Sequence, residues 1–203
     1  MTGDVTVEIY DKVTFNNHIN GSYDSIKFVG MDTDAEIYMD IQGYVEASGK
    51  DVAFEDLKLS KAEGGYVANA GFMNLAFGIF AADEVSYTNC TFANGAYASW
   101  GKNTFTGCTF YRSHDRYGFW AYGSEDIVID GCTFADFRGI KMYDEGKAGT
   151  TVLTVKNTDF TKVDNKPAIV LTYGKSLTLE NNKYSSTGVF ELDLDGAPNG
   201  TYV

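Results

Sequence analysis

Aromatic side chains that could bind a ligand are concentrated in the middle of this chain. Four of them lie at or near the ends of short apolar segments: Trp100, Trp120, Tyr122 and Tyr143. Flat aromatic rings with a polar edge give a large contact area at low entropy cost, which suits the recognition of sugar rings. We expect these four residues to form a ligand-binding row if the fold places them on one outer surface. The alternative is that long loops cover these rings, which would then have only a structural packing role.

The densest polar group of the chain lies beside these aromatic residues. Its candidate ligand contacts are Arg116, Arg138, Lys141 and Glu145. The other members of this group are Tyr111, Arg112, His114, Asp115, Tyr117, Asp136 and Asp144. Arginine and carboxylate groups next to aromatic rings are what a saccharide or uronate site would use. The alternative is a solvated loop of mutually paired charges, and the sequence leaves both readings open.

Metal and disulfide chemistry are not indicated by the three cysteines, Cys90, Cys108 and Cys132. Their number is odd and no histidine recurs beside them, so neither a disulfide framework nor a zinc site is predicted. We expect small buried thiols instead. No cofactor is expected. The surplus carboxylates could bind Ca²⁺ through oxygen, but the Asp193–Asp195 segment lacks the later ligands of a calcium loop.

These candidate residues have to be positioned by a phrase that recurs five times. The copies are Val85–Phe92, Asn103–Phe110, Ile127–Phe134, Leu153–Phe160 and Leu177–Tyr184. The closing aromatic residues are 18, 24, 26 and 24 residues apart. A repeat of this length cannot bury a core alone and must stack on its neighbours, which predicts a solenoid.

Each copy of the phrase predicts a strand, a bend and a second short strand. Apolar residues alternate before the bend, which is typical of a strand. The residue three positions before the closing aromatic is always Asn or Gly, the types that most readily adopt a left-handed backbone. The residue after it, such as Cys90, is expected to point inward. A further apolar segment follows each phrase, so each coil should carry about three strands.

The first half of the chain repeats the same design with more variation. Val52–Leu59 matches the phrase, while 37–41 and 13–17 are expected to be earlier strands. The 33-residue gap from Leu59 to Phe92 is predicted to be one enlarged coil. We therefore expect residues 1–203 to form a single all-β domain, a right-handed parallel β-helix of about nine coils with three parallel sheets.

The segments between the phrases predict which side chains face outward. Alignment on Gly101 and Gly123 puts Trp100, Tyr122 and Tyr143 at one coil position, and Ala98, Trp120 and Lys141 at another. Alternation sends four other residues inward: Phe119, Ala121, Ile140 and Met142. Because a lysine is not expected in a solenoid core, the side that carries Lys141 and Trp120 should be the outside.

Composition excludes some partners. The formal net charge of −12 opposes phosphate backbones, so nucleic-acid binding is not expected. No run of the chain approaches the roughly 20 apolar residues of a membrane span, and no signal peptide is visible. We expect a module of a larger exported protein whose signal and flanking domains lie outside this sequence.

The recurring Asn/Gly-Cys-Thr-Phe phrase, with Trp120-Ala-Tyr122-Gly and Gly139-Ile-Lys141-Met-Tyr143 between copies, resembles the right-handed parallel β-helix repeats of the pectin-lyase-like superfamily. More narrowly it is similar to β-helix modules in surface proteins of anaerobic gut bacteria. The resemblance implies a bacterial cell-surface or secreted location and a carbohydrate or host-surface ligand. The scaffold itself carries lyases, hydrolases and adhesins, so it does not define a function.

An enzymatic role on the same face is the alternative. A lyase could use Arg116, Arg138 or Lys141, and a hydrolase could pair Asp115 with Asp144 or Glu145. However, the Asn-Thr-Asp, Asp-Asp and Gly-His-Gly motifs of β-helix polygalacturonases are absent. We expect no catalytic residues and a non-catalytic binding or adhesion module, with a structural spacer as a third alternative.

Overall fold

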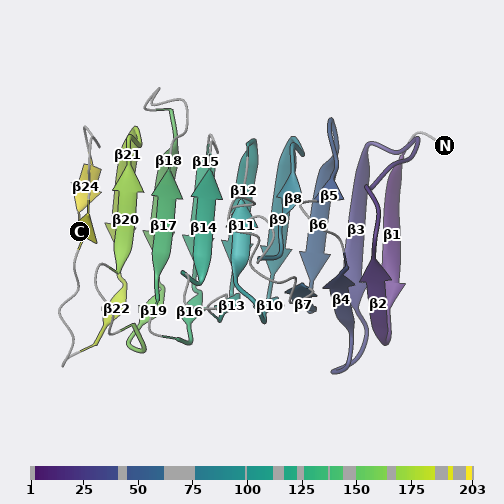
Figure 1. Cartoon of the computed structure of the whole chain (residues 1–203), viewed down its shortest axis with the longest axis horizontal. Coiled ribbons are helices and arrows are strands. Elements are labelled where there is room, and N and C mark those ends of the chain that lie inside the picture. The colour runs from purple at the N-terminus through teal and green to yellow at the C-terminus, as the bar shows by residue number, and fades with distance from the viewer. Residues whose placement is uncertain are drawn as a thin grey trace.

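The chain folds into a parallel β-solenoid whose strands stack along its long axis, from β1 near the N-terminus to β24 near the C-terminus (Figure 1). The computed structural model describes residues 3–40, 45–61, 76–98, 100–111, 117–122, 126–136, 138–143, 150–163, 168–185, 192–193 and 200–202. All the secondary-structure elements within these residues are β-strands, which confirms the predicted all-β class. That residues 1–203 form a single domain stays a prediction.

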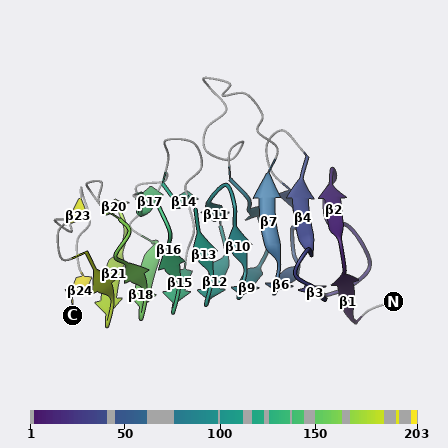
Figure 2. The ribbon, with the colours of Figure 1, turned by 90° about the horizontal axis from the view of Figure 1, so that it is seen from below.

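Two long parallel sheets form two faces of each coil, and their strands lie beside each other in Figure 2. The nine-stranded sheet contains β1 (Asp4–Ile9), β3 (Ser25–Gly30), β6 (Asp51–Glu55), β9 (Glu84–Thr88), β12 (Lys102–Thr106), β15 (Asp126–Asp130), β18 (Val152–Lys156), β21 (Ser176–Glu180) and β24 (Gly200–Tyr202). The eight-stranded sheet contains β2 (Lys12–Phe15), β4 (Glu36–Met39), β7 (Lys58–Lys61), β10 (Thr91–Phe92), β13 (Thr109–Phe110), β16 (Thr133–Phe134), β19 (Asp159–Phe160) and β22 (Lys183–Tyr184).

The third face is interrupted. Its five-stranded sheet contains β11 (Ala96–Ala98), β14 (Phe119–Tyr122), β17 (Ile140–Tyr143), β20 (Ile169–Thr172) and β23 (Leu192–Asp193). A separate pair is formed by β5 (Val45–Glu46) and β8 (Ile79–Phe80). One isolated bridge between Phe77 and Ala96 joins the two groups. The third predicted sheet is therefore present as two pieces.

The prediction of about nine coils is wrong, because the solenoid has about six complete turns. The nine-stranded sheet includes strands from partial turns at both ends of the solenoid. For β1 and β2 no third strand is described, and β24 has no described successor. The enlarged coil is confirmed, because β6 and β7 pair directly with β9 and β10.

The core consists of the positions that the phrase predicts to be inward-facing. In the copy that ends at Phe92, the residues Val85, Tyr87, Cys90 and Phe92 are all buried. The closing aromatic rings stack on one another, with centroids 5.1 Å apart for Phe92 and Phe110, 4.9 Å for Phe110 and Phe134, and 4.8 Å for Phe134 and Phe160. These distances match the spacing of neighbouring parallel strands, so the rings form one continuous buried stack.

The bends have the left-handed backbone that the sequence predicts. The residues concerned are Asp56, Asn89, Gly107, Gly131, Asn157 and Asn181, with φ between 51° and 63°. Five of these residues, all but Asn181, also donate a backbone hydrogen bond to the following coil, as in Asn89 N to Thr106 O at 2.8 Å and Gly131 N to Lys156 O at 3.0 Å. The repeated bend is therefore part of the coil-to-coil hydrogen bonding.

After three of these bends, the side chain of the next residue accepts a hydrogen bond from a backbone N–H of the preceding coil; these side chains are Cys132, Thr158 and Asn182. The backbone N–H of Cys108 donates to Cys132 Sγ at 3.3 Å, and that of Thr158 donates to Asn182 Oδ1 at 2.9 Å. These inward side chains satisfy N–H groups that a bend leaves without a strand partner. The cysteines therefore have a structural role, and all three are free and buried, as predicted.

Burial of the three thiols predicts low reactivity in the folded protein. Hydrogen bonding to Cys108 and burial raise the pKa of the Cys90 and Cys132 thiols, which disfavours the reactive thiolate at both. Hydrogen bonding to Cys132 and Cys90 lowers the pKa of the Cys108 thiol, so at this position low reactivity follows from burial, which excludes the reagent. A disulfide reagent that reports free thiols should label the native chain only slowly. After addition of denaturant it should label all 3 cysteines rapidly. Fast labelling without denaturant would contradict the buried stack.

Candidate functional site

Two neighbouring strands of the third face, β14 and β17, position the residues that were selected from the sequence. Along these strands Phe119, Ala121, Ile140 and Met142 are buried in the solenoid core, as predicted. Trp120 and Lys141 alternate with them and are paired across the two strands. Because successive side chains of a strand point to opposite sides, Trp120 and Lys141 lie on the outer surface of the sheet.

Four side chains form a patch around this pair, which we call the aromatic–cationic patch: Tyr117, Trp120, Arg138 and Lys141. Tyr117 precedes β14 by two residues and Arg138 precedes β17 by two residues, so they occupy equivalent places in adjacent coils. The Lys141 Nζ lies 4.7 Å from the centre of the Trp120 ring and 6.0 Å from that of Tyr117. The Arg138 guanidinium carbon lies 5.6 Å from the Tyr117 ring centre.

The contacts within the patch are favourable and constrain what it could bind. The Tyr117 and Trp120 rings meet edge to face at 6.4 Å, and each has a cation near one ring face. Cations over aromatic faces are held by the quadrupole of the ring, which orders Arg138 and Lys141. The ring faces below the cations are not open for a sugar to stack on. A ligand would therefore meet two ordered cations and the remaining aromatic surface.

The electrostatics of the patch differ from those of the whole molecule. The chain carries a net charge of −12, yet two cations lie together here. The Nε atom of Arg138 is buried and has no hydrogen-bond partner among the described residues. Guanidinium groups pair well with carboxylate, sulfate or phosphate oxygens. The arrangement can therefore hold an anionic group against an aromatic surface.

Trp100 is not aligned with Tyr122 and Tyr143, so the predicted row is wrong at this position. Ala98 pairs with Ala121. Three residues separate Ala98 from β12, whereas four residues separate Ala121 from β15. Trp100 lies in the shorter bend with φ of 47° and is 39% exposed. Its ring packs edge to face on Phe80 at 4.8 Å. The alignment on glycine failed because the two bends differ in length by one residue.

The residue that pairs with Trp120 in the coil before it is Tyr97, and not Ala98 as expected. Tyr97 is only 3% exposed, although it lies on the outer side of the strand. It packs with Ala76 and Trp120 in a small apolar cluster outside the main core. Val170, the partner of Lys141 on its other side, is also buried. The outer column is therefore covered in part and is not a continuous row of exposed aromatic residues.

The remaining selected residues are placed only in part. Tyr122 and Tyr143 pair across β14 and β17, as predicted, but their side chains lie outside what the structure describes. Arg116 and Glu145 lie outside the described residues, as do Asp115 and Asp144. Of the eight selected residues, the structure brings Trp120, Arg138 and Lys141 together.

Sequence reasoning did not select Tyr117 and Tyr97 as site residues. Tyr117-Gly-Phe119 and Arg138-Gly-Ile140 have the same spacing, and this signal could have aligned Tyr117 with Arg138. Tyr97 could have been aligned with Trp120 only if the shorter bend at Trp100 had been recognised. The place of both residues in the site depends on the register between neighbouring strands, because a shift of one residue changes which side chains are neighbours.

Two further features of the described residues bear on function. No group of three or more His, Cys, Asp or Glu side chains among them is arranged to hold a metal ion. In the same part of the chain no helix is long and apolar enough to cross a membrane.

Parallel strands stacked in three-faced coils define a β-helix protein. The family model described as right-handed β-helix region matches residues 63–190, and the chain belongs to this family. No match was found among curated proteins, and none among solved structures. The narrower relation to pectin-lyase-like and gut-bacterial surface proteins stays a prediction.

Proposed function

We propose that this protein is a non-catalytic binding module that recognises a carbohydrate bearing acidic groups. The observation that supports this most is the aromatic–cationic patch, in which Arg138 and Lys141 lie against the Tyr117 and Trp120 rings. The cations would pair with a carboxylate or sulfate of the ligand, and the aromatic surface would contact its apolar C–H groups.

The scaffold is consistent with this role. The patch is built on two adjacent strands whose inner residues are buried, so its side chains are presented by a rigid surface. Little conformational entropy is then lost when a ligand is ordered on it. We further propose that the module belongs to a secreted or cell-surface bacterial protein with additional domains, where a carbohydrate or another surface ligand would be its partner.

Two variants test the patch. Lys141→Gln removes one cation and is expected to weaken binding of acidic glycans on an array about tenfold, the usual effect of losing a hydrogen bond to a charged group. Trp120→Ala removes the ring on which Lys141 rests and should reduce the same signals at least as much. Binding should also decrease as salt is raised, because salt screens exposed charges.

Matched controls separate the patch from general surface effects. Trp100→Ala removes an exposed tryptophan that lies outside the patch, and Lys175→Gln removes an exposed lysine of the following coils. Both should retain glycan binding. Equal binding by the wild type, Trp120→Ala and Lys141→Gln would contradict the proposal. Release of unsaturated or reducing ends from a polysaccharide panel would instead support a lyase or hydrolase, and the absence of both signals would support a spacer.

A further inference from the structure

The bend between β3 and β4 is longer than the bends of the coils on either side. Between Val29 and Glu36 there are six residues, 30–35, of which Gly30 is the last residue of β3. Between their partners in the next coil, Glu55 and Lys58, there are only Asp56 and Leu57. Ala35 occupies the buried position that Leu57 takes in the next coil. Residues 31–34 are therefore an insertion at the corner of the solenoid. Insertions in repeat proteins are commonly placed on a binding face.

Hydrogen bonds and close packing hold this corner loop in a defined shape. The Met31 N–H donates to Ile9 O at 2.8 Å, and the Asp34 N–H donates to Asp32 Oδ1 at 3.0 Å. At its base Gly30 approaches the next coil so closely that an added Cβ would lie 2.0 Å from Asp56 O. A larger residue at position 30 would displace the loop. The loop is therefore anchored to the coils before and after it.

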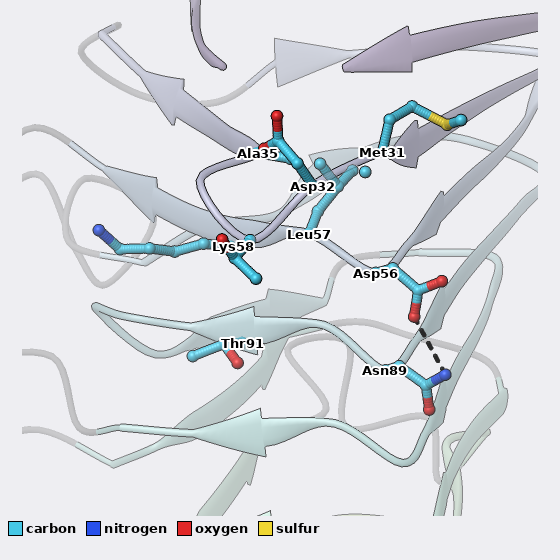
Figure 3. Close-up of a pocket in the computed structure, with 10 residues that line it drawn as sticks. Met31, Asp32, Ala35, Asp56, Leu57, Lys58, Asn89 and Thr91 are labelled. Carbon is cyan, nitrogen blue, oxygen red and sulfur yellow. Dashed lines mark hydrogen bonds between the residues drawn. The ribbon is translucent and has the colours of Figure 1, made fainter. Parts of the chain in front are cut away.

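A pocket with a volume of about 580 Å³ lies between this loop and the bends of the next two coils (Figure 3). The loop contributes Met31, Asp32 and Thr33 to its lining, and the bends of the next two coils contribute Asp56 and Asn89. This volume lies within the range of small-molecule sites. The pocket combines an exposed apolar side chain, Met31, with polar groups from three successive coils, such as Asp32, Asp56 and Asn89.

Two of the polar side chains that line the corner pocket, Asp32 and Asp56, are carboxylates that only accept hydrogen bonds. Asp56 Oδ1 accepts from Asn89 Nδ2 at 3.1 Å, and Asp32 Oδ1 accepts from the backbone of Asp34. Among the described residues, the second oxygen of each carboxylate has no hydrogen-bond donor. Lys58 does not offset them, because its side chain runs away from Asp56 in Figure 3 and its Nζ donates to Glu36 at 2.7 Å.

We propose that the corner pocket binds a neutral sugar unit. Sugar hydroxyls would donate to the second oxygens of Asp32 and Asp56, and charge-assisted hydrogen bonds of this kind are stronger than neutral ones. The C–H surface of the sugar would contact Met31. An acidic sugar is disfavoured by repulsion from two carboxylates, so this pocket and the aromatic–cationic patch select ligands of different charge.

Titration of the full chain with methyl glycosides tests this assignment. In ¹⁵N-resolved NMR spectra, methyl glucoside, methyl galactoside or methyl mannoside should shift the backbone amide signals of residues 31–34 and of Asn89. Affinity in the millimolar range is expected for such a small ligand. Asp56→Asn keeps the bend, since Asn occupies the same left-handed position in other coils, and should weaken binding about tenfold, as should Asp32→Asn.

The Asp130→Asn variant is a matched control, because Asp130 Oδ1 accepts from Asn157 Nδ2 at 2.8 Å but lies outside the pocket. It should bind the glycosides like the wild type. Lys141→Gln should also leave these shifts unchanged. The assignment of the corner pocket can therefore hold even if the aromatic–cationic patch proves not to bind acidic glycans. No shift with any neutral glycoside would overturn the assignment, as would equal binding by Asp56→Asn and the wild type. Tighter binding of methyl glucuronide or of glucosamine would also overturn it.

Discussion

Replacement of Phe110 by Ala is expected to lower the free energy of unfolding by about 3–5 kcal/mol. Phe110 is fully buried in the middle of the closing aromatic stack, with ring centres 5.1 Å from Phe92 and 4.9 Å from Phe134. It also meets Phe105 at 5.6 Å. Removing the ring leaves a cavity between coils that rigid strands cannot close, because each coil is held in register by its neighbours.

Chemical denaturation followed by circular dichroism measures this loss. Tyr184→Ala removes a ring from the last described position of the same stack, where the side chain is 37% exposed, and should cost less than half as much. Phe110→Leu should fall between the two, since it fills part of the space. Similar losses for Phe110→Ala and Tyr184→Ala would show that the buried stack does not dominate the stability of the solenoid.

Replacement of Gly131 by Val is expected to destabilise the protein by about 1–3 kcal/mol through the backbone alone. Gly131 has φ of 62°, and no atom lies within 4 Å of the position that a Cβ would occupy. Steric overlap with neighbours therefore contributes little. The cost arises because a β-branched residue is strongly disfavoured in the left-handed region.

Gly131→Asn is the matched variant for this bend. Asn89, Asn157 and Asn181 already occupy the equivalent position with φ between 51° and 53°. The Asn variant should therefore lose less than about 1 kcal/mol, because asparagine tolerates this conformation. Thermal unfolding of the two variants side by side gives the comparison. Equal stability of Gly131→Val and Gly131→Asn would contradict a backbone origin.

The bends and the core could be predicted because each is a local property repeated in every coil. The Asn or Gly before Cys90, Cys108 and Cys132 needs only its own backbone preference to form the bend. Alternation in Val85–Phe92 needs only the two-residue period of a strand, and stacking of equal repeats then brings the closing aromatic residues together. Five copies of the same preference reinforce one another.

The candidate site could be predicted only in part, because it depends on register between coils. Trp120, Arg138 and Lys141 were selected from the sequence and do lie together. Trp100 was placed in the same row, but a bend one residue shorter moves it out of alignment and puts Tyr97 beside Trp120. A difference of one residue in bend length changes which side chains are neighbours. The types of the residues in the bend do not reveal this difference.

The sequence by itself determined the repeat, the left-handed bends and the inward-facing residues, since these follow from backbone preference and apolar periodicity within a single coil. Only the tertiary structure decided which side chains of different coils meet. It placed Tyr117 beside Lys141, buried Tyr97 on the outer side of its strand, and opened a pocket between residues 31–34 and Asn89. Those contacts depend on the length of each bend and on the stacking of coils, which no local pattern encodes.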